Sequence, residues 1–208
     1  PVPCIVRTDG LAEEDSLAEN IQRAPLHPLD QFRAFQAMRE KGMKSTFRAT
    51  GQTGILITGE GVPLDAVIAD FMAGAVEWLT PDNDEDHWDI IEGQGSLFHV
   101  SYSGVTMALI HGGQPDALIL SHEPTREHMR GLPGYSLPSL EALRDLSLQL
   151  AQVANPDCKV VGISINTFHM SEEEALAYLK EVEDRMGLPT VDPFRQGAAR
   201  LAQALAAL

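Results

Sequence analysis

Residues 158–192, CKVVGISINTFHMSEEEALAYLKEVEDRMGLPTVD, carry the pattern that decides the fold class. The run CKVVGISIN is apolar and rich in β-branched side chains, as expected for a buried strand. A helix is predicted next, because Ser171 and Glu174 make a capping box and Gly187 provides a stop signal. A short strand follows in LPTVD. A strand, a helix and a strand in this order are typical of a parallel sheet.

The same alternation extends in both directions along the chain. Further strands are predicted at WDII (88–91) and PDALIL (115–120), and helices at residues 64–79, 139–154 and 192–208. VTMALIHG (105–112) fits either a helix or a strand. We therefore predict an α/β fold with a mainly parallel sheet flanked by helices, formed by residues 44–208. Residues 1–43 are predicted as a small, mostly helical appendage with one short strand at residues 2–7.

Charge and composition narrow the class of partner. The chain has 208 residues, of which 44% are hydrophobic, and a formal net charge of −15. Such acidity argues against nucleic-acid and anionic-membrane partners. No apolar run is long enough to span a bilayer, and no signal-peptide pattern is present. We therefore expect a cytoplasmic protein that acts on a small-molecule substrate, with Cys4 and Cys158 as reduced thiols.

Polar and glycine-rich residues follow three of the predicted strands, at residues 92–96, 121–126 and 166–167. In open parallel sheets, ligands bind beyond the carboxyl ends of the strands. A carboxylate such as Glu92 can hold Mg²⁺ there, and glycines let backbone N–H groups approach an anion. The alternative is that Glu92 is a solvated strand-end residue and the glycines only make a turn.

Two more segments are candidates for ligand binding. TGQTG, residues 50–54, is either an anion-binding loop or a plain turn. It is not a P-loop, because G-x-x-x-x-G-K-[ST] occurs nowhere in the sequence. His122 with Arg126 suits a substrate carboxylate, since the guanidinium group can donate two parallel hydrogen bonds. A surface ion pair of Arg126 with Glu123 or Glu127 is the alternative.

Residues 44–208 resemble the C-terminal domain of a bacterial P-loop family long known only as a domain of unknown function. The resemblance lies in TGQTGILITGEGVPLDAVIADFMAGAVEWL, DHWDIIEGQGSLFHVSYSGV, GGQPDALILSHEPTREHMRGLPGYSLPSL, VVGISINT and GLPTVDPFR. It implies a P-loop NTPase-like three-layer fold. Members of that family include D-glutamate N-acetyltransferases of D-amino-acid catabolism, so it also implies acetyl transfer from acetyl-CoA to an amino acid.

The resemblance gives the strand-end residues specific roles. Acetyl transfer needs a base to deprotonate the amine, and Glu92 or His122 can serve. The residues expected to bind the substrate are Gln52, Thr53, Gly54, Gln94, Ser96 and Arg126. We expect Glu92→Ala to abolish activity and to leave the fold intact.

The segment EGQGS, residues 92–96, also resembles the EGAGG segment of dethiobiotin synthetase-like P-loop enzymes. In those enzymes the glutamate helps to bind Mg²⁺ with ATP. The likeness implies a metal site at Glu92, with Asp65 as a second candidate ligand. It further implies that a nucleotide lies near Gly93, Gly95, Asn166 and Thr167.

Residues 1–42 resemble an internal piece of ParB-type partition proteins, through the E-N-x-x-R segment formed by Glu19, Asn20 and Arg23. In that family the segment binds CTP together with a preceding G-E-R-R segment, which is absent here, as is the helix-turn-helix. The chain thus resembles a join near EKGMKSTF that lacks the phosphate-binding elements of both families. Nucleotide chemistry is expected to be weak or absent.

Two alternatives to the enzyme reading follow from this join. One is a ParB-like fragment that binds a nucleotide or a partner. The other is an inert fusion whose apolar face, left bare by a missing domain, favours homo-oligomers.

Overall fold

The structure is a computed structural model that describes residues 36–208. The strand predicted at residues 2–7, the helices predicted before residue 36 and nearly all of the ParB-like segment lie outside this range. None of the helices within residues 36–208 is long and apolar enough to cross a membrane.

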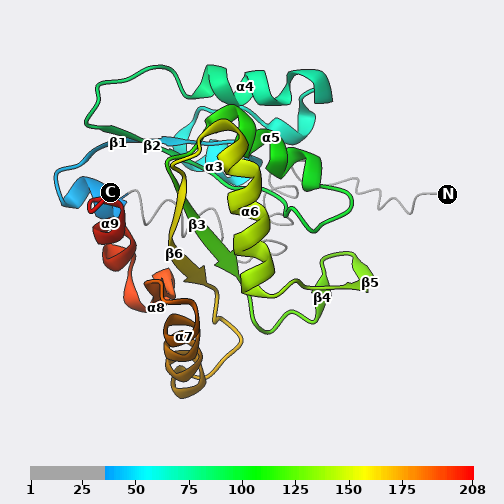
Figure 1. Ribbon diagram of the computed structural model, residues 1–208, viewed down its shortest axis with the longest axis vertical. Helices are drawn as coiled ribbons and strands as arrows, with labels where there is room; N and C mark the ends of the chain where they lie inside the picture. The colour runs from blue at the N-terminus through cyan, green and yellow to red at the C-terminus, as the bar shows by residue number, and fades with distance from the viewer. Residues whose placement is uncertain (1–35) are drawn as a thin grey trace, which may run out of the picture.

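Two parallel sheets form the centre of the described fold (Figure 1). In the first, β1 (Lys44–Arg48) pairs with β2 (His87–Ile91). The second has the order β3–β6–β7, formed by β3 (Ala117–His122), β6 (Lys159–Ile165) and β7 (Thr190–Val191). The predicted α/β class with a mainly parallel sheet is therefore confirmed.

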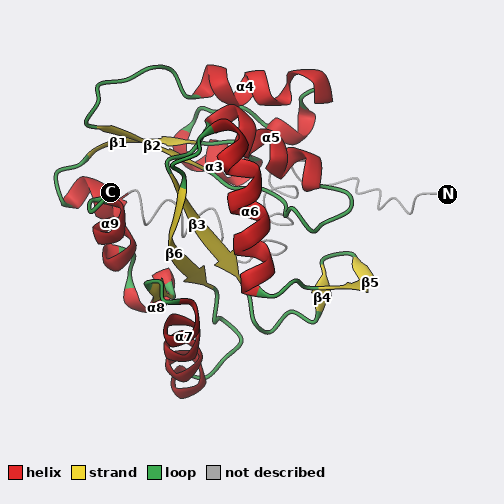
Figure 2. Cartoon of the chain, viewed as in Figure 1, coloured by secondary structure: helices red, strands yellow, loops and turns green. Residues whose placement is uncertain are grey.

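Helices connect and cover these strands. They are α3 (Gln52–Thr58), α4 (Met72–Leu79), α5 (Ser103–Gly113), α6 (Leu140–Ala154), α7 (Glu172–Met186), α8 (Pro193–Gln196) and α9 (Ala199–Leu205). Figure 1 shows α6 and α9 on opposite sides of β3 and β6. A separate antiparallel hairpin, β4 (His128–Met129) and β5 (Leu132–Ser136), projects beside α6 (Figure 2).

The predicted helix ends at α6 and α7 are confirmed. The Ser139 hydroxyl accepts a hydrogen bond from the Ala142 N–H, and Ser171 and Glu174 form the full capping box. Gly187 ends α7 in the left-handed conformation, with φ of 66°, which glycine adopts without steric cost. These signals are local, so the sequence alone was enough to place them.

Three expectations for the helices need correction or completion. The helix predicted at residues 64–79 begins only at Met72, because two 3-10 turns, Leu64–Ala66 and Ala69–Phe71, precede it. The terminal helix divides into α8 and α9 at Gly197, whose φ is 73°. The ambiguous run VTMALIHG is helical and belongs to α5.

A β-bulge interrupts the pairing of β3 with β6. Leu118 pairs with Val160, but the next residue pairs with Gly162, so Val161 is an extra residue in β6. Val160 therefore packs in the cluster that contains Ile163 and the inner side of α7. Val161 packs in the cluster on the opposite face, which contains residues of α9.

Candidate functional site

Glu92, directly after β2, is the most buried acid of the predicted site, with 1% of its surface exposed. Its carboxylate Oε2 accepts hydrogen bonds from the backbone N–H groups of Thr50 and Gly51, each at 2.9 Å. The Thr50 hydroxyl donates to the Glu92 carbonyl at 2.7 Å. Glu92 thus connects the end of β2 to the loop between β1 and α3, and its negative charge lies at the N-terminus of α3.

Burial raises the pKa of the Glu92 carboxyl group, and the backbone N–H groups of Gly51, Thr50 and Gly54 oppose that rise. The alternative of a solvated strand-end carboxylate is therefore wrong. A base must reach its substrate, whereas this carboxylate lies in the interior and is hydrogen-bonded to the backbone. The geometry favours a positioning role for Glu92.

Gly54 and Gln94, two further predicted residues, lie against Glu92 and Thr50. We call the five residues Thr50, Gly51, Gly54, Glu92 and Gln94 the Glu92 cluster. A Cβ atom added at Gly54 would lie 2.1 Å from the Glu92 carboxylate, so only glycine fits there. The Gln94 side-chain amide donates to the Thr50 carbonyl, and its nitrogen lies 3.2 Å from the Thr50 hydroxyl. TGQTG therefore consists of a short loop and the first turn of α3. Glu92, which follows the neighbouring strand, binds the backbone N–H groups of this loop.

The other residues predicted around this cluster are more accessible. Gln52, Gly93 and Gly95 are exposed, and Thr53 and Ser96 are half-buried. Asp65 is exposed on the first 3-10 turn. No group of three or more His, Cys, Asp or Glu side chains able to hold a metal occurs within residues 36–208. The metal site at Glu92 and Asp65 stays a prediction.

The second strand end brings His122, Glu123 and Arg126 together. Arg126 forms an ion pair with Glu123, as in the alternative reading. Burial, and then the positive charge of Arg126, lower the pKa of His122, while Glu123 acts in the opposite direction. His122 is half-buried rather than enclosed. A neutral imidazole is therefore available near neutral pH beside a cation that can attract a substrate carboxylate.

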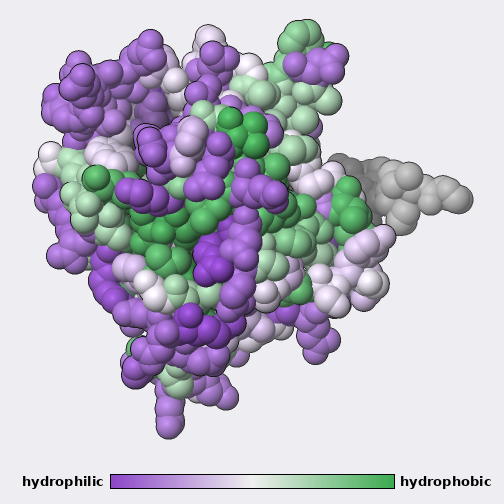
Figure 3. All heavy atoms as spheres, viewed as in Figure 1, coloured by the Kyte–Doolittle hydropathy of each residue, from purple (hydrophilic) through white to green (hydrophobic). Residues whose placement is uncertain are grey.

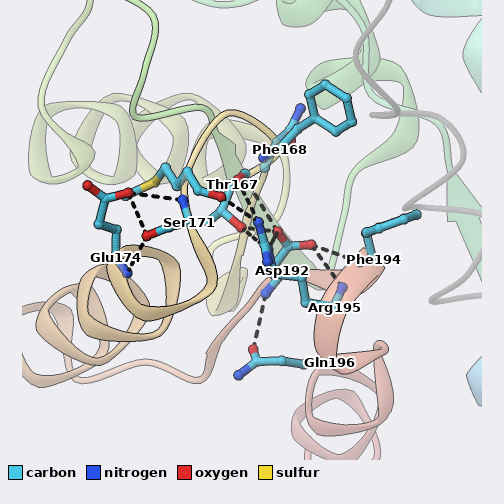
Figure 4. Close-up of polar contacts among 10 residues, drawn as sticks. Thr167, Phe168, Ser171, Glu174, Asp192, Phe194, Arg195 and Gln196 are labelled. Carbon is cyan, nitrogen blue, oxygen red and sulfur yellow. Dashed lines mark hydrogen bonds and ion pairs between the residues drawn. The ribbon is translucent and has the colours of Figure 1, made fainter.

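The third strand end centres on an acid that the sequence analysis missed, Asp192 (Figure 4). Its carboxylate accepts hydrogen bonds from the Thr167 N–H and hydroxyl and from the Phe194 N–H at 2.8 Å. Arg195 donates to the Thr167 hydroxyl at 2.9 Å and to the Met170 carbonyl at 2.8 Å. The signal was present in the sequence, because an aspartate followed by a proline is a common start of a helix.

Thr167 and Asn166, the residues predicted to lie near a nucleotide, differ in accessibility. Thr167 has no exposed surface, and Asp192 and Arg195 occupy its side chain. The Asn166 side chain is half-buried and accepts a hydrogen bond from the Phe168 N–H at 3.0 Å. Thr167 is therefore placed to order the loop after β6, and Asn166 is the more accessible of the two.

Comparison with known proteins agrees with this architecture. Residues 31–202 match a domain of unknown function, DUF1611_C, described as a P-loop domain. The crystal structure of a DUF1611 family protein from Anabaena variabilis ATCC 29413 has a TM-score of 0.81 and 36% sequence identity to this chain. The match covers 88% of this chain and 53% of that one, and supports the P-loop-like fold.

Two relatives named D-glutamate N-acetyltransferase are also similar. The protein from Tritonibacter scottomollicae is 79% identical over 171 residues, which are 82% of this chain and 51% of the relative. The protein from a Pseudoalteromonas species is 51% identical over 162 residues, which are 78% of this chain and 49% of the relative. The chain thus spans about half the length of the curated relatives that it matches.

Proposed function

The chain belongs to the DUF1611 family, and from this premise we propose that it is the C-terminal domain of a D-glutamate N-acetyltransferase. The observation that carries the proposal is the 79% identity over 171 residues to a relative of that name. The predicted site supports it, because an imidazole, a guanidinium group and an ordered glycine-rich loop all lie at the carboxyl ends of the strands.

In the proposed reaction His122 is the base. The ammonium group of D-glutamate must lose a proton before its nitrogen can attack, and the lowered pKa of His122 keeps the imidazole neutral to accept that proton. The nitrogen then forms a bond with the thioester carbon of acetyl-CoA. The carbon–sulfur bond breaks, the nitrogen loses its second proton as the amide forms, and coenzyme A leaves as a thiolate that takes up a proton.

Arg126 is proposed to attract a carboxylate of the substrate. Its ion pair with Glu123 uses one guanidinium nitrogen, whereas arginine carries five N–H donors in a planar fork. The Arg126 side chain is 35% exposed, and that of Glu123 is 15% exposed. The pair therefore orients the guanidinium group while leaving part of it accessible.

The Glu92 cluster is proposed to shape the neighbouring loop. With Glu92 bonded to the backbone, Gln52 and Thr53 lie at the start of α3, and Gln94 is fixed against Thr50. Gln52 is then the exposed substrate-binding side chain predicted on this side, and Thr53 and Ser96 are half-buried.

Magnesium-bound ATP, the other predicted ligand, is left out of the proposed reaction. The only acid at the end of β2 is Glu92, whose carboxylate is buried and bonded to backbone N–H groups, and no group of metal-ligating side chains accompanies it in residues 36–208. No step of the proposed reaction uses a nucleotide or a metal.

A chimera tests the proposal directly. The 171 matched residues of the Tritonibacter relative are replaced by the corresponding residues of this chain, and release of the coenzyme A thiol is followed with D-glutamate and with L-glutamate. We expect acetylation of D-glutamate. A folded chimera without that activity would overturn the proposal.

His122→Gln in the chimera tests the role of the base. Loss of a general base lowers kcat by about 10²–10⁴-fold. The matched control is His87→Gln. His87 is the first residue of β2 and contacts Thr46, so it lies at the end of the sheet opposite to the carboxyl ends that carry the predicted site. Equal rates for the two variants would remove His122 from the mechanism.

A further inference from the structure

The hairpin formed by β4 and β5 carries a positive charge that no acid within residues 36–208 neutralises. Most cationic side chains of this part of the chain form ion pairs with carboxylates, namely Lys44, Arg48, Arg126, Arg144, Lys180, Arg185, Arg195 and Arg200. Arg130, between the two strands of the hairpin, is exposed and has no such partner among the described acids. In a chain with a net charge of −15, a guanidinium group without a carboxylate is well suited to bind an anionic ligand.

The backbone on both sides of Arg130 is fixed. Met129 pairs with Leu132 across the hairpin, so Arg130 and Gly131 form a two-residue turn. Met129 has only 4% of its surface exposed, and Gly131 has a φ of 74°, which glycine adopts without steric cost. An arginine on an ordered turn has less freedom to lose on binding than one on a loose loop.

His99 holds this turn from outside the hairpin. Its Nδ1 accepts a hydrogen bond from the Ser101 N–H at 3.2 Å, so the ring proton is on Nε2, which donates to the Arg130 carbonyl at 3.0 Å. His99 is 8% exposed and lies between β2 and α5. The hairpin is therefore tied to the segment that follows the Glu92 end of β2.

An exposed aromatic ring lies beside the same contact. The ring of Tyr102 packs against that of His99, with 4.8 Å between the ring centroids, and Tyr102 is 52% exposed. Figure 3 shows pale and purple residues where the hairpin lies in Figure 1, so the surface of the hairpin is polar. A ligand that combines a phosphate with a planar base matches an arginine and an aromatic ring that share one imidazole neighbour.

We propose that the turn of the β4–β5 hairpin binds the adenosine phosphate end of acetyl-CoA, with Arg130 donating hydrogen bonds to a phosphate and Tyr102 stacking against the adenine ring. The inference rests on the proposed function, because it assigns a binding surface to one of the two substrates. Arg130 follows Arg126 by four residues in the sequence, so the hairpin continues directly from the strand end that carries the proposed base.

The second carboxylate of D-glutamate is the other anion that Arg130 could bind. A phosphate is favoured because Arg130 is exposed in the turn of a separate hairpin, whereas D-glutamate is small and must place its nitrogen beside His122. Coenzyme A is long enough to have its thioester and its phosphates in different places.

The first test measures binding by isothermal titration calorimetry, with coenzyme A and ATP as probes, to the 208-residue chain and to the full-length chimera. Arg130→Gln removes the charge and should weaken the binding of coenzyme A about 10-fold, as the loss of one charge-assisted hydrogen bond predicts. The matched control is Lys159→Gln. Lys159 also has no carboxylate partner among residues 36–208, but it begins β6 at the opposite end of the sheet, so this variant should bind as the unchanged chain does.

A pair of variants at His99 tests whether the turn must be held. His99→Gln keeps a donor near the position of Nε2, whereas His99→Asn keeps an acceptor near the position of Nδ1 and loses the contact with Arg130. We expect His99→Asn to weaken the binding of coenzyme A about 5-fold, the effect of one neutral hydrogen bond, and His99→Gln to weaken it less. Equal binding by the two variants would remove His99 from the proposal.

Kinetics of the chimera separate this inference from the proposed function. Acetyl-pantetheine carries the thioester without the adenine ring and the phosphates. Arg130→Gln should raise KM about 10-fold for acetyl-CoA, but should not raise it for acetyl-pantetheine or for D-glutamate. A chimera that binds coenzyme A through Arg130 and does not acetylate D-glutamate would overturn the proposed function alone. An active chimera in which Arg130→Gln leaves the KM of acetyl-CoA unchanged would overturn this inference alone.

Three further outcomes would refute the site. The first is the absence of coenzyme A binding by both the chain and the chimera. The second is a rise in KM for D-glutamate in place of acetyl-CoA, which would assign Arg130 to the second carboxylate. The third is ATP binding as tight as that of coenzyme A and equally weakened by Arg130→Gln, which would identify a nucleotide as the ligand.

Discussion

Replacing Glu92 with alanine should destabilise the fold as well as the site. The Glu92 carboxylate accepts hydrogen bonds from the buried N–H groups of Thr50 and Gly51. An orphaned buried N–H costs about 1–3 kcal/mol, so losing both acceptor contacts costs about 2–6 kcal/mol. Domains of this kind are stable by only about 5–15 kcal/mol. The expectation that Glu92→Ala leaves the fold intact therefore does not follow from the structure.

Urea unfolding followed by far-UV circular dichroism measures this cost. With a slope of about 2 kcal/mol per molar urea, a loss of 4 kcal/mol lowers the midpoint by about 2 M. Glu92→Gln is the matched variant, since it keeps the length of the side chain and an oxygen acceptor, and should lose less than half as much. A midpoint for Glu92→Ala within about 0.3 M of the unchanged chain would refute the reasoning.

The pH dependence of the same measurement gives an independent check. The folded-state pKa of Glu92 is raised above its ordinary value of 4.5, so its contribution to stability is fully present below pH 4.5 and is lost as the pH rises through the raised pKa. Glu92→Gln does not titrate. The stability of Glu92→Gln relative to the unchanged chain should therefore improve as the pH rises across that range, and a constant difference would contradict the direction of the shift.

Three further perturbations follow from the geometry. Gly54→Ala places a Cβ atom 2.1 Å from the Glu92 carboxylate and should cost about 1–3 kcal/mol, whereas Gly74→Ala in α4 meets nothing within 4 Å and should gain about 0.5–1 kcal/mol; equal urea midpoints would contradict both. Ser171→Ala removes the cap of α7 and should cost about 1 kcal/mol in the same assay, and no loss would show that the cap is dispensable. The lowered pKa of His122 gives stability that is present above pH 6.5 and lost as the pH falls through that pKa, so His122→Gln should flatten the acid side of the stability curve; an unchanged slope would refute it.

Sequence patterns predicted the elements whose causes are local. The caps of α6 and α7 depend on residues three positions apart, and the strands β2, β3 and β6 are short apolar runs between polar segments. The helix predicted at residues 64–79 failed at its start for a tertiary reason. The Leu64 N–H bonds to the Thr50 carbonyl, which ties that turn to a distant loop instead of to a regular helix.

The sequence predicted which strand ends form the candidate site, but it did not predict what each residue does there. The segment after β2 was identified because glycines and a carboxylate end an apolar strand. Whether Glu92 contacts solvent or backbone depends on a loop about 40 residues earlier, and no local pattern encodes that approach. Asp192 is a similar case, since the terminal helix was predicted to begin there, but its hydrogen bonds to Thr167 join residues that are 25 positions apart.

The extra residue in β6 has a consequence for how the sequence can change over time. Because Val161 is inserted, Val160 and Ile163 lie on the side of α7, while Val161 and Gly162 face α9, where a Cβ atom on Gly162 would lie 2.4 Å from Leu201. Deleting Val161 would restore regular alternation in β6 and would leave the facing and the pairing of its other residues unchanged, whereas a deletion elsewhere in the strand would exchange its two sets of side chains between the two faces. Alignments of homologues should therefore show a one-residue gap at this place more readily than anywhere else in β6.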